Sequence, residues 1–169
     1  LGQPASVGPV DTGHLTAELV AARQSIRPGE TIQVALRQKI QKGWHTYWRN
    51  SGDSGDATSI AWTLPDGWKA GPFVWPAPRR LPVGPLMNYG YEGEVLLPMT
   101  LTAPAPAQPG QTVTLNAQAA FLVCAEICVP EDAALTLSLP VTAAQGAPHR
   151  DWGPKIAQTL AAAPKRVGL

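Results

Sequence analysis

The sequence is poor in charged residues, and this limits the kinds of molecule that it can bind through electrostatic attraction. Asp, Glu, Lys and Arg make up 15% of the 169 residues, and 13 basic and 12 acidic side chains leave a net charge of +1. The sequence shows no basic cluster of the kind that attracts nucleic acids or anionic membranes, so we expect neither as a partner. The first residue is not Met, and no basic segment precedes an apolar one, so we expect a processed chain whose export signal is not present.

The sequence also lacks a segment with the composition of a membrane-spanning helix. The longest uncharged run, residues 95–125, could cross a bilayer by its length, but it contains four prolines together with several Gln, Thr and Asn residues. We therefore expect no direct membrane insertion of this domain.

Proline and glycine are abundant instead, with 18 and 16 residues. Proline interrupts helices, so a helical bundle is excluded, and the regular spacing of the aliphatic residues argues against disorder. The length is that of one ordinary domain that can bury its own core. These features favour an all-β protein with proline-rich connections.

Hydrophobic and polar residues alternate along much of the chain. Residues 15–21 and 32–40 have this period of two, and Arg-Pro-Gly-Glu at 27–30 predicts a turn between them, hence an antiparallel hairpin. Further strands are predicted at residues 44–49, 59–64, 94–101, 112–123 and 134–141. Seven or so short strands separated by turns predict an immunoglobulin-like two-sheet sandwich.

The ends and two interruptions complete the predicted organisation. Residues 50–58 are polar and glycine-rich and residues 71–88 hold five prolines, so neither segment is expected to be a central strand. Asp151 as a cap and Pro154 in the first turn predict a short C-terminal helix. We expect an N-terminal extension at 1–13, the sandwich domain at 14–145 and a helical tail at 146–169.

The only two cysteines, Cys124 and Cys128, stand four residues apart. A disulfide between them would close too short a loop to stabilise the fold much, so the pair is better interpreted as redox or metal chemistry. Three intervening residues let the two thiols approach within bonding distance. An inert pair in a hairpin remains an alternative, because cysteine often behaves as a small hydrophobic residue.

Negative charge surrounds the cysteine pair. Glu126, Glu131 and Asp132 flank it, and no Lys or Arg lies within ten residues on either side. Such neighbours disfavour the thiolate, which suits a reductant that reacts only when a partner activates it. The same carboxylates could equally just solvate a loop.

Metal binding is the main competing hypothesis for the cysteines. Zinc is disfavoured because His14, His45 and His149 do not stand at finger spacing. The C-x-x-x-C-x-P pattern with a distant His is similar to the copper loop of Sco-type metallochaperones, and thiolates select Cu(I). Those proteins have a thioredoxin fold, whose alternating strands and helices are not found here. A copper module using Cys124, Cys128 and His45 stays an alternative, as does an inert interaction domain.

Four segments together carry a family resemblance. They are Lys-Gly-Trp-His-Thr-Tyr-Trp at 42–48, Ser-Ile-Ala-Trp-Thr-Leu-Pro-Asp-Gly-Trp at 59–68, Asn-Tyr-Gly-Tyr-Glu-Gly-Glu at 88–94 and Cys-Ala-Glu-Ile-Cys-Val-Pro at 124–130. In this order they resemble the amino-terminal periplasmic domain of the thiol-disulfide interchange protein DsbD, with particular similarity to the copper-tolerance ScsB relatives. The resemblance runs from about residue 14 to residue 141.

The resemblance implies a protein-disulfide reductase module with no cofactor beyond a redox-active Cys124–Cys128 disulfide, and no metal. It implies a monomeric periplasmic domain of an inner-membrane protein, which passes electrons from the membrane-embedded part to thioredoxin-like periplasmic proteins. Cys128 would form the mixed disulfide with the partner and Cys124 would resolve it. An upstream donor is required, because no G-x-G-x-x-G motif for a nicotinamide or flavin is present.

The resemblance also assigns neighbours to the cysteines. Residues 88–93 would be a cap loop that lays an aromatic ring over the disulfide; the expected cap residues are Asn88, Tyr89, Tyr91 and Glu92. His45 and Tyr47 match positions where the family places tyrosines beside the cysteines. Strand alternation puts His45 and Tyr47 on one face and the tryptophans at 44 and 48, which we expect to be packing residues, on the other. The His at a usual Tyr position and the short cysteine spacing depart from the family pattern.

Overall fold

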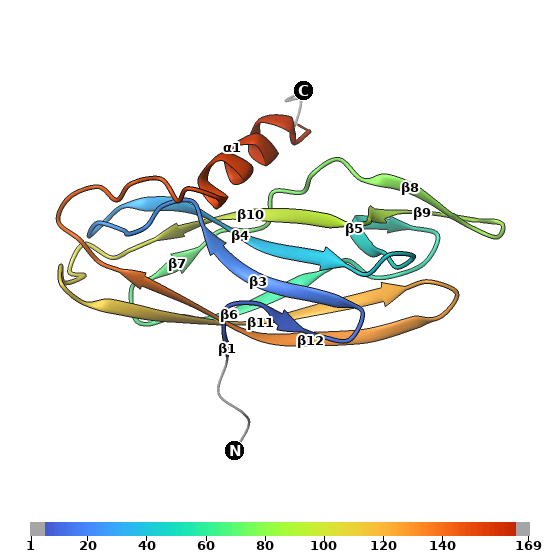
Figure 1. Cartoon of the computed structure of the whole chain (residues 1–169), viewed down its shortest axis with the longest axis horizontal. Coiled ribbons are helices and arrows are strands. Elements are labelled where there is room, and N and C mark those ends of the chain that lie inside the picture. The colour runs from blue at the N-terminus through green and yellow to red at the C-terminus, as the bar shows by residue number, and fades with distance from the viewer. Residues whose placement is uncertain (1–5, 165–169) are drawn as a thin grey trace, which may run out of the picture.

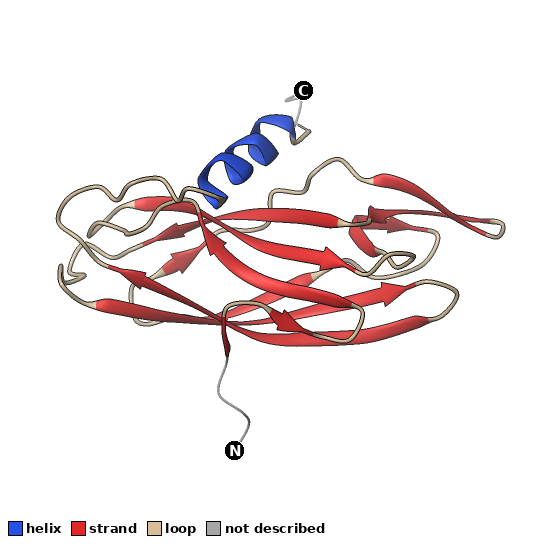
Figure 2. Ribbon diagram, in the orientation of Figure 1, coloured by secondary structure: helices blue, strands red, loops and turns tan. Residues whose placement is uncertain are grey.

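The computed structural model describes residues 6–164. Its elements in chain order are β1 (Ser6–Val7), β2 (Val10–Asp11), β3 (Leu15–Ala21), β4 (Thr31–Ile40), β5 (Thr46–Gly52), β6 (Ser59–Thr63), β7 (Lys69–Ala70), β8 (Arg79–Val83), β9 (Leu86–Tyr91), β10 (Glu94–Thr102), β11 (Thr112–Cys124), β12 (Cys128–Pro140) and α1 (Trp152–Ala162). The strand orders are β1-β12-β11-β6, β2-β3-β4-β10-β7 and β5-β9-β8. Figures 1 and 2 show two long layers facing each other, with the helix outside them. The predicted all-β immunoglobulin-like sandwich with one short C-terminal helix is confirmed.

The core lies between the two larger sheets. Strands β3 and β4 pair antiparallel from Leu15 opposite Ile40, which confirms the predicted hairpin, and β10 pairs with the other edge of β4. Alternate residues of these strands and of β11 and β12 point inward; Leu36, Leu97 and Leu135 are fully buried there. Trp44, Trp48 and Trp62 are partly buried and pack against this cluster, as expected of packing residues.

Helix α1 covers the outer face of the β3-β4-β10 layer (Figure 1). Ile156 is 1% exposed and packs against Val20, Ala35 and Leu96, which form a second small core. The predicted cap is wrong in detail, because the Asp151 side chain makes no capping bond. Nδ1 of His149 accepts the first helical N–H groups instead, from the backbone of residues 151 and 152 at 3.1 Å.

Three segments are more ordered than the sequence predicts. Strands β8 and β9 form a hairpin inside and just beyond the proline-rich stretch at 71–88, with Pro82 on the edge strand, where a missing N–H is tolerated. In the expected N-terminal extension, β1 pairs with β12 and β2 pairs with β3, while residues 1–5 lie outside the described part. The polar stretch at 50–58 also begins as strand, because β5 continues to Gly52.

Glu131 on β12 forms hydrogen bonds with the segment that precedes β3. Its side chain is 4% exposed, and its oxygens accept hydrogen bonds from the Thr12 hydroxyl at 2.6 Å and the His14 backbone N–H at 3.0 Å. Nδ1 of His14 lies 2.5 Å from Glu131 Oε2, and the His14 ring stacks on Trp44. Burial alone raises the pKa of Glu131, but these bonds outweigh it and hold that pKa below its ordinary value.

This carboxylate makes the stability of the domain depend on pH. Because the pKa of Glu131 is lower in the folded chain than in the unfolded one, its contribution is present above about pH 4.5 and is lost as the pH falls through the folded value. Glu131→Gln should cost about 1–3 kcal/mol at neutral pH. Urea unfolding at several pH values should show a shallower acid loss for this variant than for the wild type. The control is Glu126→Gln on the exposed hairpin loop; identical acid profiles for Glu131→Gln and the wild type would contradict the assignment.

Candidate active site

The two cysteines lie at the tip of the β11–β12 hairpin. Cys124 ends β11, Cys128 begins β12, and the ladder register places them directly opposite each other, with Cα atoms 4.1 Å apart and the sulfurs joined in a disulfide. The backbone N–H of Ala125 donates to the carbonyl of Ile127 at 2.9 Å across the three-residue loop. The hairpin therefore holds the pair in bonding position through its own register.

The two cysteines differ in exposure. Cys124 is 1% exposed, whereas Cys128 is an exposed residue. Ile127 beside it is 65% exposed, an unusual position for a large aliphatic side chain that the sequence reasoning did not single out. A partner molecule can therefore approach the Cys128 side of the bond, and Cys124 stays covered.

His45 is joined directly to Cys124 through the backbone. The His45 N–H donates to the Cys124 carbonyl at 2.9 Å, and the Cys124 N–H donates to the His45 carbonyl at 3.0 Å. Two residues that exchange both bonds in an antiparallel pair carry their side chains on the same face of the sheet. The bridge therefore attaches the β5-β9-β8 sheet to the end of β11, beside the disulfide; Figure 1 shows these strands and the hairpin tip at the same end of the molecule.

Tyr47 completes a buried polar pair with His45. The two residues are 2% and 7% exposed, the Tyr47 hydroxyl lies 3.1 Å from His45 Nε2, and the rings meet edge to face at 5.1 Å between centroids. Burial lowers the pKa of His45, with the Glu92 carboxylate acting weakly against it, and burial raises the pKa of Tyr47. Both groups are therefore neutral at neutral pH, and either can donate or accept the bond between them.

The segment at 88–93 is mostly strand, so its description as a loop is wrong for residues 88–91, which belong to β9. Asn88 is 1% exposed, and its Oδ1 accepts bonds from the N–H and hydroxyl of Ser54, a contact that fixes the neighbouring loop. Tyr91 is 4% exposed and donates its hydroxyl to the Pro76 carbonyl at 2.8 Å, so its ring belongs to the core. Burial raises the pKa of that hydroxyl well above its ordinary value.

Tyr89 and Glu92 are the more accessible members of the segment. Tyr89 is half-buried, and its ring meets Trp48 at 6.4 Å. Glu92 is exposed and forms a surface ion pair with Arg79 at 3.6 Å. That either residue caps the disulfide stays a prediction.

Residues 14–140 match the family model described as "Thiol:disulfide interchange protein DsbD, N-terminal". The chain belongs to the DsbD N-terminal family. It is therefore a thiol-disulfide interchange domain, and such domains act through a disulfide without a cofactor. No curated protein sequence matches the chain.

The fold of this DsbD N-terminal domain is similar to that of a solved structure. The N-terminal periplasmic domain of ScsB from Proteus mirabilis superposes with a TM-score of 0.69 at 23% identity, covering 99% of this chain and 62% of that one. The chain thus spans less than two thirds of that relative. A yeast GGA1 GAE domain also matches, at a TM-score of 0.39 and 12% identity over 78% of this chain and 95% of that chain, too low to inform the fold.

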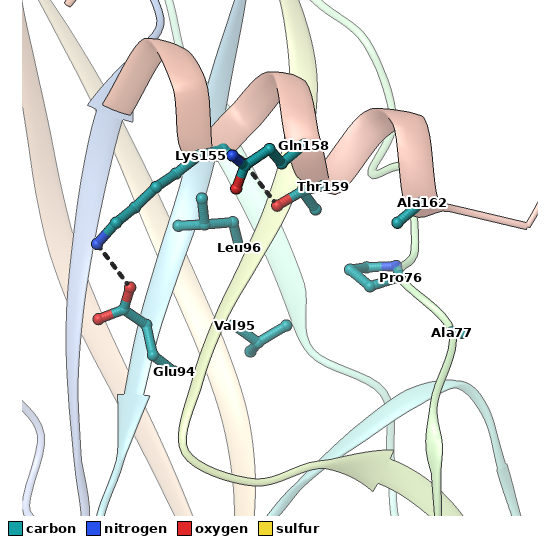
Figure 3. Close-up of a pocket in the computed structure, with 9 residues that line it drawn as sticks. All are labelled: Pro76, Ala77, Glu94, Val95, Leu96, Lys155, Gln158, Thr159 and Ala162. Atoms are coloured by element: carbon teal, nitrogen blue, oxygen red, sulfur yellow. Dashed lines mark hydrogen bonds and ion pairs between the residues drawn. The ribbon is translucent and has the colours of Figure 1, made fainter. Parts of the chain in front are cut away.

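The cysteine pair of the DsbD N-terminal domain lies away from the hollow between α1 and β10. That hollow has a volume of about 460 Å³, and Lys155 and Glu94 pair there at 3.4 Å (Figure 3). Its lining contains neither cysteine and none of the predicted site residues. Exchange with another protein needs a sulfur that the partner can reach, and the hairpin tip supplies it.

The acidic neighbours of the pair divide between two environments. Glu131 is an odd number of positions from Cys128 along β12, so it faces the other side of the sheet, where His14 and Thr12 bind it. Glu126 and Asp132 are exposed. That these two exposed carboxylates disfavour the thiolates stays a prediction.

Residues 6–164 contain neither a metal-ligand cluster nor a membrane-spanning helix. No group of three or more His, Cys, Asp or Glu in that range could hold a metal ion. The one helix there is too short to cross a membrane.

Proposed function

We propose that this DsbD N-terminal domain is a protein-disulfide reductase module. The observation that carries the proposal is the asymmetric disulfide at the hairpin tip, with Cys128 exposed and Cys124 buried. In the reduced domain the Cys128 thiolate attacks a partner disulfide, forming a mixed disulfide and releasing one partner thiolate. The Cys124 thiolate then attacks Cys128 Sγ, which restores the domain's disulfide and releases the second partner thiolate. Two electrons and two protons pass to the partner.

The proposal places the domain between two other redox components. Electrons would come from the membrane-embedded part of a longer parent protein, and thioredoxin-like periplasmic proteins would receive them. Family membership, and the similarity to a periplasmic domain whose chain is longer than this one, support this placement. The domain would work as a monomer, because each exchange needs only one hairpin tip.

The direct test of reductase activity is electron transfer in solution. The reduced domain is mixed with an oxidised thioredoxin-like protein, the reaction is quenched with an alkylating reagent, and free thiols in both chains are counted by mass. We expect two thiols to appear in the partner for each disulfide that forms in the domain. A domain that keeps both thiols while the partner stays oxidised would overturn the proposal.

Shielding by the aromatic ring of Tyr89 is a separate prediction. If this half-buried ring limits access to the sulfurs, Tyr89→Ala should speed oxidation of the reduced pair by a small oxidant several-fold, because access limits exchange as much as thiolate fraction does. The rate is followed by timed alkylation with peroxide as oxidant. Tyr91→Phe is the matched control, since it removes only a hydroxyl bound to Pro76. An unchanged rate in a folded Tyr89→Ala variant would leave that residue without a shielding role.

A further inference from the structure

We infer that His45 is the proton acceptor for Cys124 when that thiol resolves the mixed disulfide. The inference rests on the proposed function and assigns a chemical role to a buried histidine beside the redox pair. It is carried by a row of side chains that crosses β12 and β11 and continues to the residue before β5 and the residue after β9.

The row follows from the registers of three strand pairs. Cys128 lies opposite Cys124 in the β11–β12 ladder, and Cys124 lies opposite His45 in the backbone bridge. Thr46 lies opposite Tyr91 in the β5–β9 pair, and continuing that register one residue beyond both strands sets His45 opposite Glu92. The Glu92 carboxylate also lies near enough to act on the charge of His45. Directly opposite residues share a face and sit about 4.5–5.5 Å apart at Cβ. The order along the face is therefore Cys128, Cys124, His45 and Glu92, which places an imidazole between a thiol and a carboxylate.

Cys124 needs such a base because it is buried. At 1% exposure its thiolate is poorly hydrated, and no Lys or Arg lies within ten residues of it in the sequence to stabilise the anion. The resolving step nevertheless requires the thiolate, since the protonated thiol is not the nucleophile. A neighbouring proton acceptor removes this obstacle, as a His does for a Cys or Ser nucleophile in other enzymes.

His45 has the surroundings of a base. Its Nε2 is hydrogen-bonded by Tyr47, the Glu92 carboxylate after β9 acts on its charge and pairs with Arg79 on β8, and the cysteines of β11 and β12 share its row. The same elements also carry Arg49, Arg80, Tyr89, Tyr91, Glu131 and Asp132. The Tyr47 hydroxyl forms a hydrogen bond with His45 Nε2 at 3.1 Å, so His45 Nδ1 is the ring nitrogen left to accept the thiol proton. Burial lowers the pKa of His45, so the ring is neutral and able to accept a proton at neutral pH. The nearby Glu92 carboxylate favours the imidazolium once it forms.

The step balances in atoms and charge. The Cys124 S–H bond breaks, its proton moves to His45, and the sulfur lone pair forms the bond to Cys128 Sγ. The bond between Cys128 and the partner sulfur breaks, and its electron pair leaves on the partner thiolate. That thiolate, or water, then takes the proton from the imidazolium and returns His45 to its neutral form.

A two-phase reaction with dithiobis(nitrobenzoate) tests the role. When the reagent is limiting, Cys128 attack releases the first coloured thionitrobenzoate in a bimolecular phase. Cys124 attack then releases the second in a unimolecular phase, so the resolving step is measured alone. The variants are His45→Gln, Tyr47→Phe and, as a histidine control far from the hairpin, His149→Asn, whose side-chain oxygen can still accept the N–H groups that begin α1.

We expect the wild-type unimolecular rate to level off above the His45 pKa, and the rate of His45→Gln to rise about tenfold per pH unit. Near neutral pH that variant should be about a hundredfold slower in this phase. Its bimolecular phase should be unchanged, and the control should match the wild type in both. Tyr47→Phe should shift the midpoint of the profile, because the hydroxyl that holds Nε2 is lost.

The experiment distinguishes failure of the proposed exchange function from failure of the role proposed for His45. Absence of the second phase in the wild type would contradict the proposed exchange function itself. Two normal phases with a wild-type unimolecular rate that climbs tenfold per pH unit throughout would overturn the role of His45 alone, even if the Gln variant does not fold. A folded His45→Gln variant with the wild-type profile would overturn it as well.

Discussion

The reduced Cys124→Ala variant should accumulate as a covalent complex with a thioredoxin-like protein that keeps a single active-site cysteine, supplied as its thionitrobenzoate disulfide. Cys128 is exposed and keeps its thiol, so it attacks the partner sulfur and releases thionitrobenzoate. The other thiol of the sequence is gone, and the partner has no second thiol to reverse the step. The mixed disulfide should then decay orders of magnitude more slowly than in the wild type and disappear only when a reductant is added. Non-reducing electrophoresis and mass measurement of the complex give the readout.

The matched variant is Cys128→Ala. Its remaining thiol at Cys124 is 1% exposed, so it should form little or no complex under the same conditions. Efficient trapping by Cys128→Ala and none by Cys124→Ala would reverse the assigned roles. The difference between the two variants therefore tests the exposure argument rather than the mere presence of a thiol.

The Gly90→Ala variant should lose much of its stability. A Cβ at Gly90 would lie 1.9 Å from the Thr46 carbonyl oxygen and 3.0 Å from the Tyr47 Cα, both backbone atoms that cannot move aside cheaply. Overpacking of this kind costs about 1–3 kcal/mol, and more where the backbone must shift. Urea unfolding should show a lower midpoint, because strand β9 would separate from β5.

The control for this variant is Gly93→Asn, three residues further along. Gly93 has a φ of +69°, and a Cβ there would meet nothing within 4 Å. Asn tolerates that left-handed conformation, so little stability should be lost. A Gly90→Ala domain as stable as the wild type would mean that β9 does not pack closely on β5, which would also undo the register that sets His45 opposite Glu92.

The strands in which hydrophobic and polar residues alternate regularly could be predicted from the sequence, and the β8–β9 hairpin could not. Its edge strand contains Pro82 and its turn contains Pro85, so the local pattern is that of a connection, and only pairing with β9 makes it a strand. The group that caps the start of helix α1 could not be predicted either. Asp151 has the right residue type for a cap, but His149 is held within reach of the N–H groups by the bridge between Arg23 and Pro148, which no local pattern encodes.

For the candidate site, too, one part could be predicted from the sequence and another part could not. The cysteine spacing and the strand on either side already predict the hairpin tip. The exposure difference between Cys124 and Cys128 depends on what covers each one, and the contact of His45 with Cys124 joins segments about eighty residues apart. The role of Gly90 could not be predicted from the sequence either. A side chain is excluded at this position because the Thr46 backbone packs closely against it.

Reversible oxidation of the Cys124–Cys128 pair is the central claim, and a redox titration in glutathione buffers measures it most directly. The domain is equilibrated at a series of potentials, free thiols are alkylated, and the mass reports how many cysteines were reduced. We predict one reversible two-electron transition at a potential between about −320 and −120 mV, the range between reducing cytosolic and strongly oxidising periplasmic couples. A pair that stays fully oxidised or fully reduced across that range would contradict the account.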